Sequence, residues 1–192
     1  RLVTNCVRTE NEMAGAPTGG MDQSASLRCR EGHALELDCR DGSVTHVPFD
    51  LAAEDLALLV IDTKAKHSLD DGQYGARRAA CERAAQILGV ELLADIAIED
   101  LPQALERLSS ADDADELVKR TRHVVTEIDR TRRLVDLLQD GRPLRDEKLA
   151  EAGRLMDASH ESLRVDYECT CPELDVAVEA ARAAGAHGAR MT

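Results

Sequence analysis

Two carboxylates on either side of a glycine-rich turn are the side chains of this sequence best placed to do chemistry. Glu10 ends an amphipathic helical pattern, and residues 15–20 then supply a cluster of turn formers before Asp22. A glutamate on a helix and an aspartate on a turn can converge when the chain reverses between them, which suits a metal ligand and a base for phosphoryl transfer. The same spacing also occurs where a helix end, a loop and an N-cap aspartate have no catalytic function. On spacing alone, this structural interpretation is favoured.

The motifs around this turn resemble those of the galactokinases, members of the GHMP family of small-molecule kinases. The turn itself matches at Glu10-Asn11-Glu12, Gly15, Pro17, Gly19, Met21-Asp22-Gln23 and Ser26. Further matches follow in the family's order: Val60-Ile61-Asp62-Thr63, Lys66-His67-Ser68-Leu69, Tyr74, Arg77-Arg78, Arg122-His123, Gly153-Arg154-Leu155-Met156, Ser159-His160-Glu161-Ser162, Cys171-Pro172-Glu173-Leu174-Asp175 and Gly188-Ala189-Arg190-Met191-Thr192. The resemblance covers essentially the whole chain and corresponds to the second half of the family's members.

The resemblance implies an α+β fold of the GHMP kinase type. Residues 1–52 would complete the N-terminal domain, which binds sugar and ATP, and residues 53–192 would form most of the helix-covered C-terminal domain. The family's N-terminal sugar-binding segment, its phosphate loop and its C-terminal glycine run have no counterpart in residues 1–192. We therefore expect a fragment that is inactive alone, with the catalytic arginine and the adenine site outside it.

The activity implied by the resemblance is transfer of the γ-phosphoryl group of ATP to the anomeric hydroxyl of galactose, giving galactose 1-phosphate. Asp22 would be the catalytic residue that accepts or orients the proton of the sugar hydroxyl, and Glu10 would be a ligand of Mg²⁺. Gly19, Asp22 and Tyr74 would contact the sugar. Gly20 departs from the family, which mostly has an aliphatic residue there, and an added glycine is expected to loosen the turn by about 0.5–1 kcal/mol.

Two other functions remain open on these residues. One is a kinase for N-acetylgalactosamine, since the C-terminal motifs are shared. The other is a non-catalytic regulator on the same fold that senses galactose and ATP.

Composition limits the partners. A net charge of −13 over 192 residues argues against nucleic acid. No apolar run reaches membrane-spanning length and no signal peptide is visible, so we expect a cytoplasmic protein. The resemblance implies galactose and ATP as its partners, and we expect a monomer. The six cysteines are scattered, and we expect buried free thiols rather than disulfides or a zinc site.

Hydrophobic periodicity predicts mostly helices, with strands early in the chain. A hairpin is predicted over residues 35–49 around an Asp41-Gly42 turn, and the apolar run 56–61 predicts a strand buried on both faces. Helices are predicted over 73–88, 100–108, 113–139 and 145–164, and a last one to residue 185 that opens with a Thr170/Glu173 capping box. Residues 188–192 predict the start of another strand.

Overall fold

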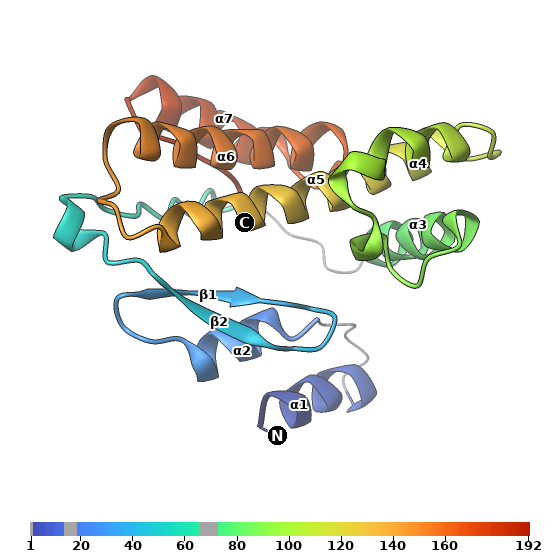
Figure 1. Cartoon of the computed structure of the whole chain (residues 1–192), viewed down its shortest axis with the longest axis horizontal. Coiled ribbons are helices and arrows are strands. Elements are labelled where there is room, and N and C mark those ends of the chain that lie inside the picture. Colours follow the sequence, from blue (N-terminus) through green and yellow to red (C-terminus); the bar gives the residue numbers. More distant parts are fainter. Residues whose placement is uncertain (1, 14–18, 66–72) are drawn as a thin grey trace. The chain divides into compact units, whose positions relative to one another are not determined.

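The computed structural model of this chain describes residues 2–13, 19–65 and 73–192 (Figure 1). These residues form two compact units, and each is described by itself. The first comprises residues 1–59 and 135–144, and the second comprises residues 60–134 and 145–192. The domain boundary expected after residue 52 stays a prediction; the division between the units falls between Leu59 and Val60.

The first unit holds two short helices and a hairpin. Helix α1 spans Leu2–Arg8 and continues as a π-helical turn, η1, over Thr9–Met13; α2 spans Met21–Arg28. Strands β1 (His33–Leu37) and β2 (Val44–Pro48) pair antiparallel, with His33 opposite Pro48 and Leu37 opposite Val44. Between them Gly42 takes φ 71, a left-handed conformation that glycine adopts without steric cost, so the predicted hairpin and its turn are confirmed.

The predicted strand over residues 56–61 is wrong. These residues have no regular secondary structure, and the side chains of Leu58, Leu59 and Val60 are 65%, 78% and 79% exposed. A continuous apolar run forms a buried strand only when other strands flank it. The sheet in the described part of the chain has two strands, β1 and β2, and neither pairs with this run.

The second unit is helical. Its helices are α3 (Gln73–Leu88), α4 (Leu101–Leu108), most of α5 (Ala114–Gln139), α6 (Asp146–Val165) and α7 (Pro172–Ala183), with short 3-10 turns at Leu93–Asp95 and Ile98–Asp100. The last part of α5, residues 135–139, belongs to the first unit. The core between α3, α4 and the start of α5 combines small and branched residues, among them Ala84, Leu108 and Leu117, each fully buried. Alanine on one face of α3 lets neighbouring helices approach closely, which compensates for the scarcity of aromatic side chains.

All four internal helix predictions are confirmed to within one residue, because glycines mark several helix ends. Gly89 after α3 and Gly141 after α5 take φ 72 and φ 74, as expected for helix C-termini. The predicted capping box before α7 is wrong: the N-cap is Cys171, and no side chain caps the helix. Pro172 at the first helical position fixes the start instead, because its ring presets a helical φ and it has no amide hydrogen to satisfy.

The predicted strand over residues 188–192 is also not formed in the described structure. This C-terminal segment, residues 187–192, is fixed by α6 rather than by a neighbouring strand. The Ala189 amide donates to Asp157 Oδ1 at 3.0 Å, and the Met191 amide donates to His160 Nδ1 at 3.3 Å. Side chains of α6 thus take the place of a strand's hydrogen-bonding partners.

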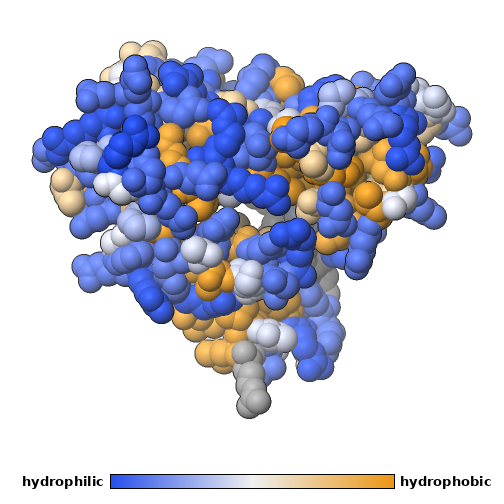
Figure 2. All heavy atoms as spheres, viewed as in Figure 1, coloured by the Kyte–Doolittle hydropathy of each residue, from blue (hydrophilic) through white to orange (hydrophobic). Residues whose placement is uncertain are grey.

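Charged and polar residues cover most of the face shown in Figure 2, with apolar patches between them. Among the described helices, none combines the length and the apolar character needed to cross a membrane.

Candidate active-site residues

Asp22 lies in the first turn of α2, directly after a sharp turn of the backbone. The N-cap of α2 is Gly20, with φ 83 and ψ 12, and no side chain caps this helix. Asp22 is therefore not an N-cap residue, so the N-cap interpretation of its position is wrong. Its side chain is exposed. A carboxylate in the first turn of a helix interacts favourably with the helix dipole.

Gly20 is required by packing as well as by backbone conformation. A Cβ added there would lie 2.9 Å from Cγ2 of Val7 in α1, closer than normal carbon–carbon contact. The expectation that this glycine loosens the turn is therefore corrected: its left-handed φ and the close approach of Val7 both favour glycine. At Gly19, by contrast, an added Cβ would meet no described atom within 4 Å. Gly19 is also exposed.

Glu10 lies in the π-helical turn η1 and is half-buried. π-Helical turns often occur at functional sites because they redirect side chains away from the regular helix surface. The neighbouring Glu12 is held in an exposed ion pair with Arg8 at 3.0 Å, whereas no described residue is recorded as bonding the carboxylate of Glu10. Of the two glutamates, Glu10 is thus the one whose oxygens are free to bind a ligand.

Glu10, Gly19 and Asp22 belong to the first unit, where α1 and α2 are in contact. No hydrogen bond joins Glu10 to Asp22 among the described residues. The turn residues Gly15 and Pro17, which carry part of the motif, lie outside the described residues.

Tyr74 belongs to the second unit, at the second position of α3. Its side chain is 57% exposed, so it does not pack on the core as a structural aromatic residue would. The motif at residues 66–69 lies outside the described part of the chain.

The first turn of α3 is fixed by Arg77. Its Nε donates to the Tyr167 carbonyl at 2.9 Å, and its Nη2 donates to the carbonyl of Glu168 and, at 2.8 Å, to Gln73 Oε1. We expected one arginine of the Arg77-Arg78 pair to bind a carboxylate and the other to face solvent. Arg78 does pair with Glu82 at 2.8 Å, but Arg77 bonds the backbone just after α6 and thereby positions the helix that carries Tyr74.

A buried polar network between α5 and α6 was not predicted from the sequence. Arg120 is 6% exposed, and its Nη1 donates to the Asp166 carbonyl at 2.6 Å and to Glu168 Oε2 at 2.9 Å. Arg122 pairs with Asp166 at 2.7 Å. The sequence feature that could have indicated this network is the presence of polar residues on the buried face of α5, next to Leu117 and Val125.

His123 is part of the same network. Its Nδ1 lies 3.0 Å from Ser162 Oγ, and its ring stacks on Tyr167 with the ring centroids 4.4 Å apart. Burial lowers the pKa of His123 to about 4, so the ring is neutral near pH 7.

The cysteines form no disulfide, as expected: all six are free. The expectation that they are buried is wrong, because Cys29 and Cys39 are exposed and the other four are half-buried. Within the described residues, no three histidine, cysteine, aspartate or glutamate side chains gather as a metal site would require. A zinc site at Cys169 and Cys171 is therefore not seen.

Comparisons with known proteins connect these observations. The family GHMP kinases C terminal matches residues 142–192, which include α6, α7 and the C-terminal segment. The galactokinase of Streptomyces coelicolor is 50% identical over 192 residues, which is 100% of this chain and 47% of that protein. The galactokinase of Homo sapiens is 43% identical over 188 residues, or 97% of this chain and 45% of that protein.

A solved structure agrees with the sequence comparisons. The crystal structure of Lactococcus lactis galactokinase complexed with galactose superposes with a TM-score of 0.81 at 30% identity, covering 98% of this chain and 47% of that one. The chain thus spans about half the length of the relatives it matches. It is related to the galactokinases along its whole length, and its residues 142–192 carry the C-terminal part of the GHMP kinase fold.

Proposed function

We propose that the complete protein to which this chain belongs phosphorylates galactose at its anomeric hydroxyl with ATP. The observation that carries the proposal is the 50% identity to a galactokinase over all 192 residues. The exposed carboxylate of Asp22, presented behind a left-handed glycine, is consistent with it.

Asp22 is the proposed catalytic residue. Phosphoryl transfer has a loose transition state, so the enzyme gains most from positioning the nucleophile and stabilising charge. The carboxylate of Asp22 would accept a hydrogen bond from the sugar hydroxyl and take up its proton as the bond to phosphorus forms. The first turn of α2 holds this side chain in place, and Gly20 packed on Val7 fixes where α2 begins.

Glu10 is the proposed protein ligand of Mg²⁺. Mg²⁺ binds oxygen, keeps several waters and takes one or two carboxylates, so a half-buried glutamate without another partner fits it. When bound, the ion neutralises charge on the transferred phosphoryl group. The described residues contribute Glu10 to this site and no cluster of further ligands.

Gly19 and Tyr74 are the proposed sugar contacts. Gly19 is exposed, and Tyr74, which is 57% exposed, lies on a helix that is fixed by Arg77. The bound galactose in the structure of the Lactococcus lactis relative favours galactose over N-acetylgalactosamine as the substrate. A cytoplasmic location and a monomeric state complete the proposal.

The proposal is tested with the complete protein, ATP, Mg²⁺ and each sugar in turn, with formation of the sugar phosphate followed by ³¹P NMR. We expect galactose 1-phosphate and little product from N-acetylgalactosamine. Preference for the second sugar would reassign the substrate. Binding of galactose and ATP without any turnover would instead identify a sensor.

A further inference from the structure

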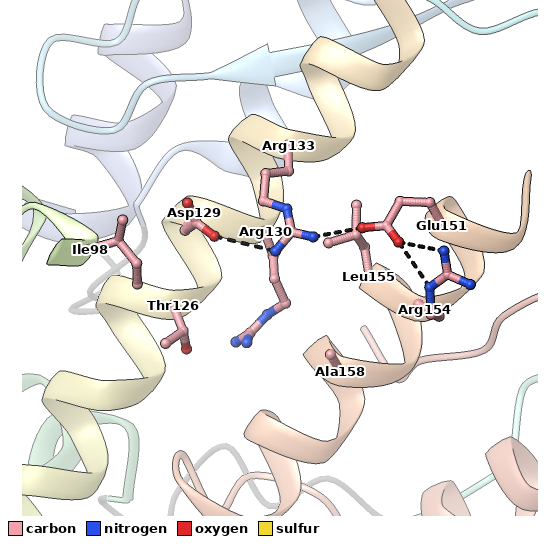
Figure 3. Close-up of a pocket in the computed structure, with 9 residues that line it drawn as sticks. All are labelled: Ile98, Thr126, Asp129, Arg130, Arg133, Glu151, Arg154, Leu155 and Ala158. Atoms are coloured by element: carbon pink, nitrogen blue, oxygen red, sulfur yellow. Dashed lines mark hydrogen bonds and ion pairs between the residues drawn. The ribbon is translucent and has the colours of Figure 1, made fainter. Parts of the chain in front are cut away.

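The second unit contains a cavity that the proposed function does not use. It has a volume of about 360 Å³ and lies between α5 and α6, with Ile98 at one side (Figure 3). Three of its lining residues are arginines: Arg130 and Arg133 from α5, and Arg154 from α6. A volume of this size is at the lower end of the range for small-molecule sites.

Arg130 has an unsatisfied donor in this cavity. Its side chain is 14% exposed, and its Nε donates to Glu127 Oε2 at 2.8 Å. Its Nη2 is buried and has no hydrogen-bond partner among the described residues. In Figure 3 its guanidinium group points away from the ion pairs around Glu151 and toward the space between the helices.

This donor differs from the other unsatisfied atoms of the described chain. Five buried side-chain nitrogen or oxygen atoms lack a hydrogen-bond partner in the described part of the chain. Of the residues that carry these atoms, Arg130 alone lines the cavity. A buried N–H group without an acceptor is costly, and a guanidinium group can only donate. An acceptor that enters the cavity would satisfy this donor of Arg130.

Arginines outnumber carboxylates among the residues that line the cavity. Arg133 and Arg154 share Glu151, at 2.6 Å and 2.7 Å, and Asp129 lies 3.7 Å from Arg133. Glu127, which bonds Arg130, is also paired with Arg190 at 3.1 Å. Three arginines and two carboxylates thus line the cavity, in a chain whose net charge is −13.

We propose that this cavity binds a phosphate group, with Arg130 as its principal ligand. The guanidinium group is planar and carries several donors, so it binds the oxygens of a phosphate with two parallel hydrogen bonds more readily than those of a neutral ligand. Leu155 and Ala158 add apolar surface beside the arginines, which gives room for a short organic group attached to the phosphate. The group can therefore come from inorganic phosphate or from a small phosphomonoester.

The test is calorimetric titration of the complete protein with inorganic phosphate, and separately with glycerol 3-phosphate, at low ionic strength held constant with chloride. We expect saturable binding in the millimolar range, and tighter binding of the ester if the apolar wall contributes. The variant Arg130→Met should weaken binding by about tenfold or more, as expected for loss of a charge-assisted hydrogen bond. The matched control is Arg132→Met on the same helix, which removes an exposed arginine that does not line the cavity and should change the affinity less than about twofold.

A second variant, which changes no charge, tests the proposal even if Arg130→Met does not fold. Ala158 is exposed on the cavity wall, so Ala158→Leu should fill the space without disturbing the core. It should reduce phosphate binding while galactose binding is unchanged. Absence of saturable binding in the unmodified protein, or equal affinities in Arg130→Met and Arg132→Met, would show that Arg130 is only hydrated. Neither result depends on whether the protein phosphorylates galactose.

Discussion

The backbones of Gly153 in α6 and Gly188 in the C-terminal segment are in direct contact. A Cβ on Gly188 would lie 2.6 Å from the Cα of Gly153 and 2.7 Å from its carbonyl oxygen. No side chain larger than hydrogen fits on either residue. This contact and the hydrogen bonds to Asp157 and His160 fix the path of residues 187–191 along α6.

Replacing Gly153 by alanine should therefore destabilise the protein, because the new Cβ would lie 1.8 Å from the carbonyl oxygen of His187. We expect a loss of about 1–3 kcal/mol or more in the free energy of unfolding, measured with urea. Gly75→Ala is the control, since Gly75 lies in α3 and no atom of the described residues lies within 4 Å of an added Cβ. That variant should be neutral or slightly stabilising. Equal losses in the two variants would contradict the contact.

Asp22→Asn in the complete protein should preserve the fold and remove most turnover with galactose. The amide has nearly the same size but cannot take up the proton of the sugar hydroxyl. Circular dichroism checks the fold, and a coupled assay of ADP release measures the rate. Substantial production of galactose 1-phosphate by this variant would assign Asp22 a structural function.

Glu10→Gln should raise the Mg²⁺ concentration needed for half-maximal activity, because one anionic oxygen ligand is lost. Glu12→Gln is the matched control: its carboxylate is occupied by Arg8 on the surface, and an exposed ion pair contributes little. Activity is measured against free Mg²⁺ at saturating galactose. The same shift in both variants would mean that Glu10 is not a ligand.

Tyr74→Phe should raise the KM for galactose more than the KM for ATP. The variant loses one hydroxyl contact, which contributes about 0.5–1.5 kcal/mol. Its ring is 57% exposed, so removal of the hydroxyl leaves the packing of α3 intact. Initial rates with each substrate varied in turn give both constants, and equal changes in the two would indicate damage to α3 instead.

His123 should make the folded state less stable in acid. Its pKa is lowered to about 4 by burial, whereas in the unfolded chain it has its ordinary value of 6.5. As the pH falls from 6.5 to 4, His123 becomes protonated in the unfolded chain but stays neutral in the folded chain. The free energy of unfolding therefore decreases over this interval. The full effect is about 3 kcal/mol. In His123→Gln the free energy of unfolding should fall less between about pH 7 and pH 4.5, and an unchanged difference would exclude His123 as the cause.

Local sequence signals were sufficient for most of the fold. The helix over residues 73–88 follows from its composition and from the glycine that ends it, and the hairpin follows from its Asp41-Gly42 turn. Such features depend on residues near in sequence. The strand over residues 56–61 could not be judged in this way, because a strand exists only with a partner strand.

The candidate site was likewise predictable from the sequence only in part. The placement of Asp22 behind a tight glycine turn was predictable from residues 15–22 and the family motif. The preference for Glu10 over Glu12 gains support from the pairing of Glu12 with Arg8. The contacts of Arg77 and Arg120 with residues after α6 were not predictable, since they join positions up to 91 residues apart and leave no periodic pattern.

The apolar run over residues 56–61, exposed from residue 57 onward, affects the behaviour of this chain in concentrated solution. Six consecutive residues without charge, proline or glycine, including two β-branched ones at its end, have the composition of segments that stack into cross-β aggregates. The acidic residues Glu54, Asp55 and Asp62 flank the run and act as gatekeepers against such stacking through mutual repulsion. Self-association through this run should therefore increase with salt and at acid pH, where that repulsion is screened or neutralised.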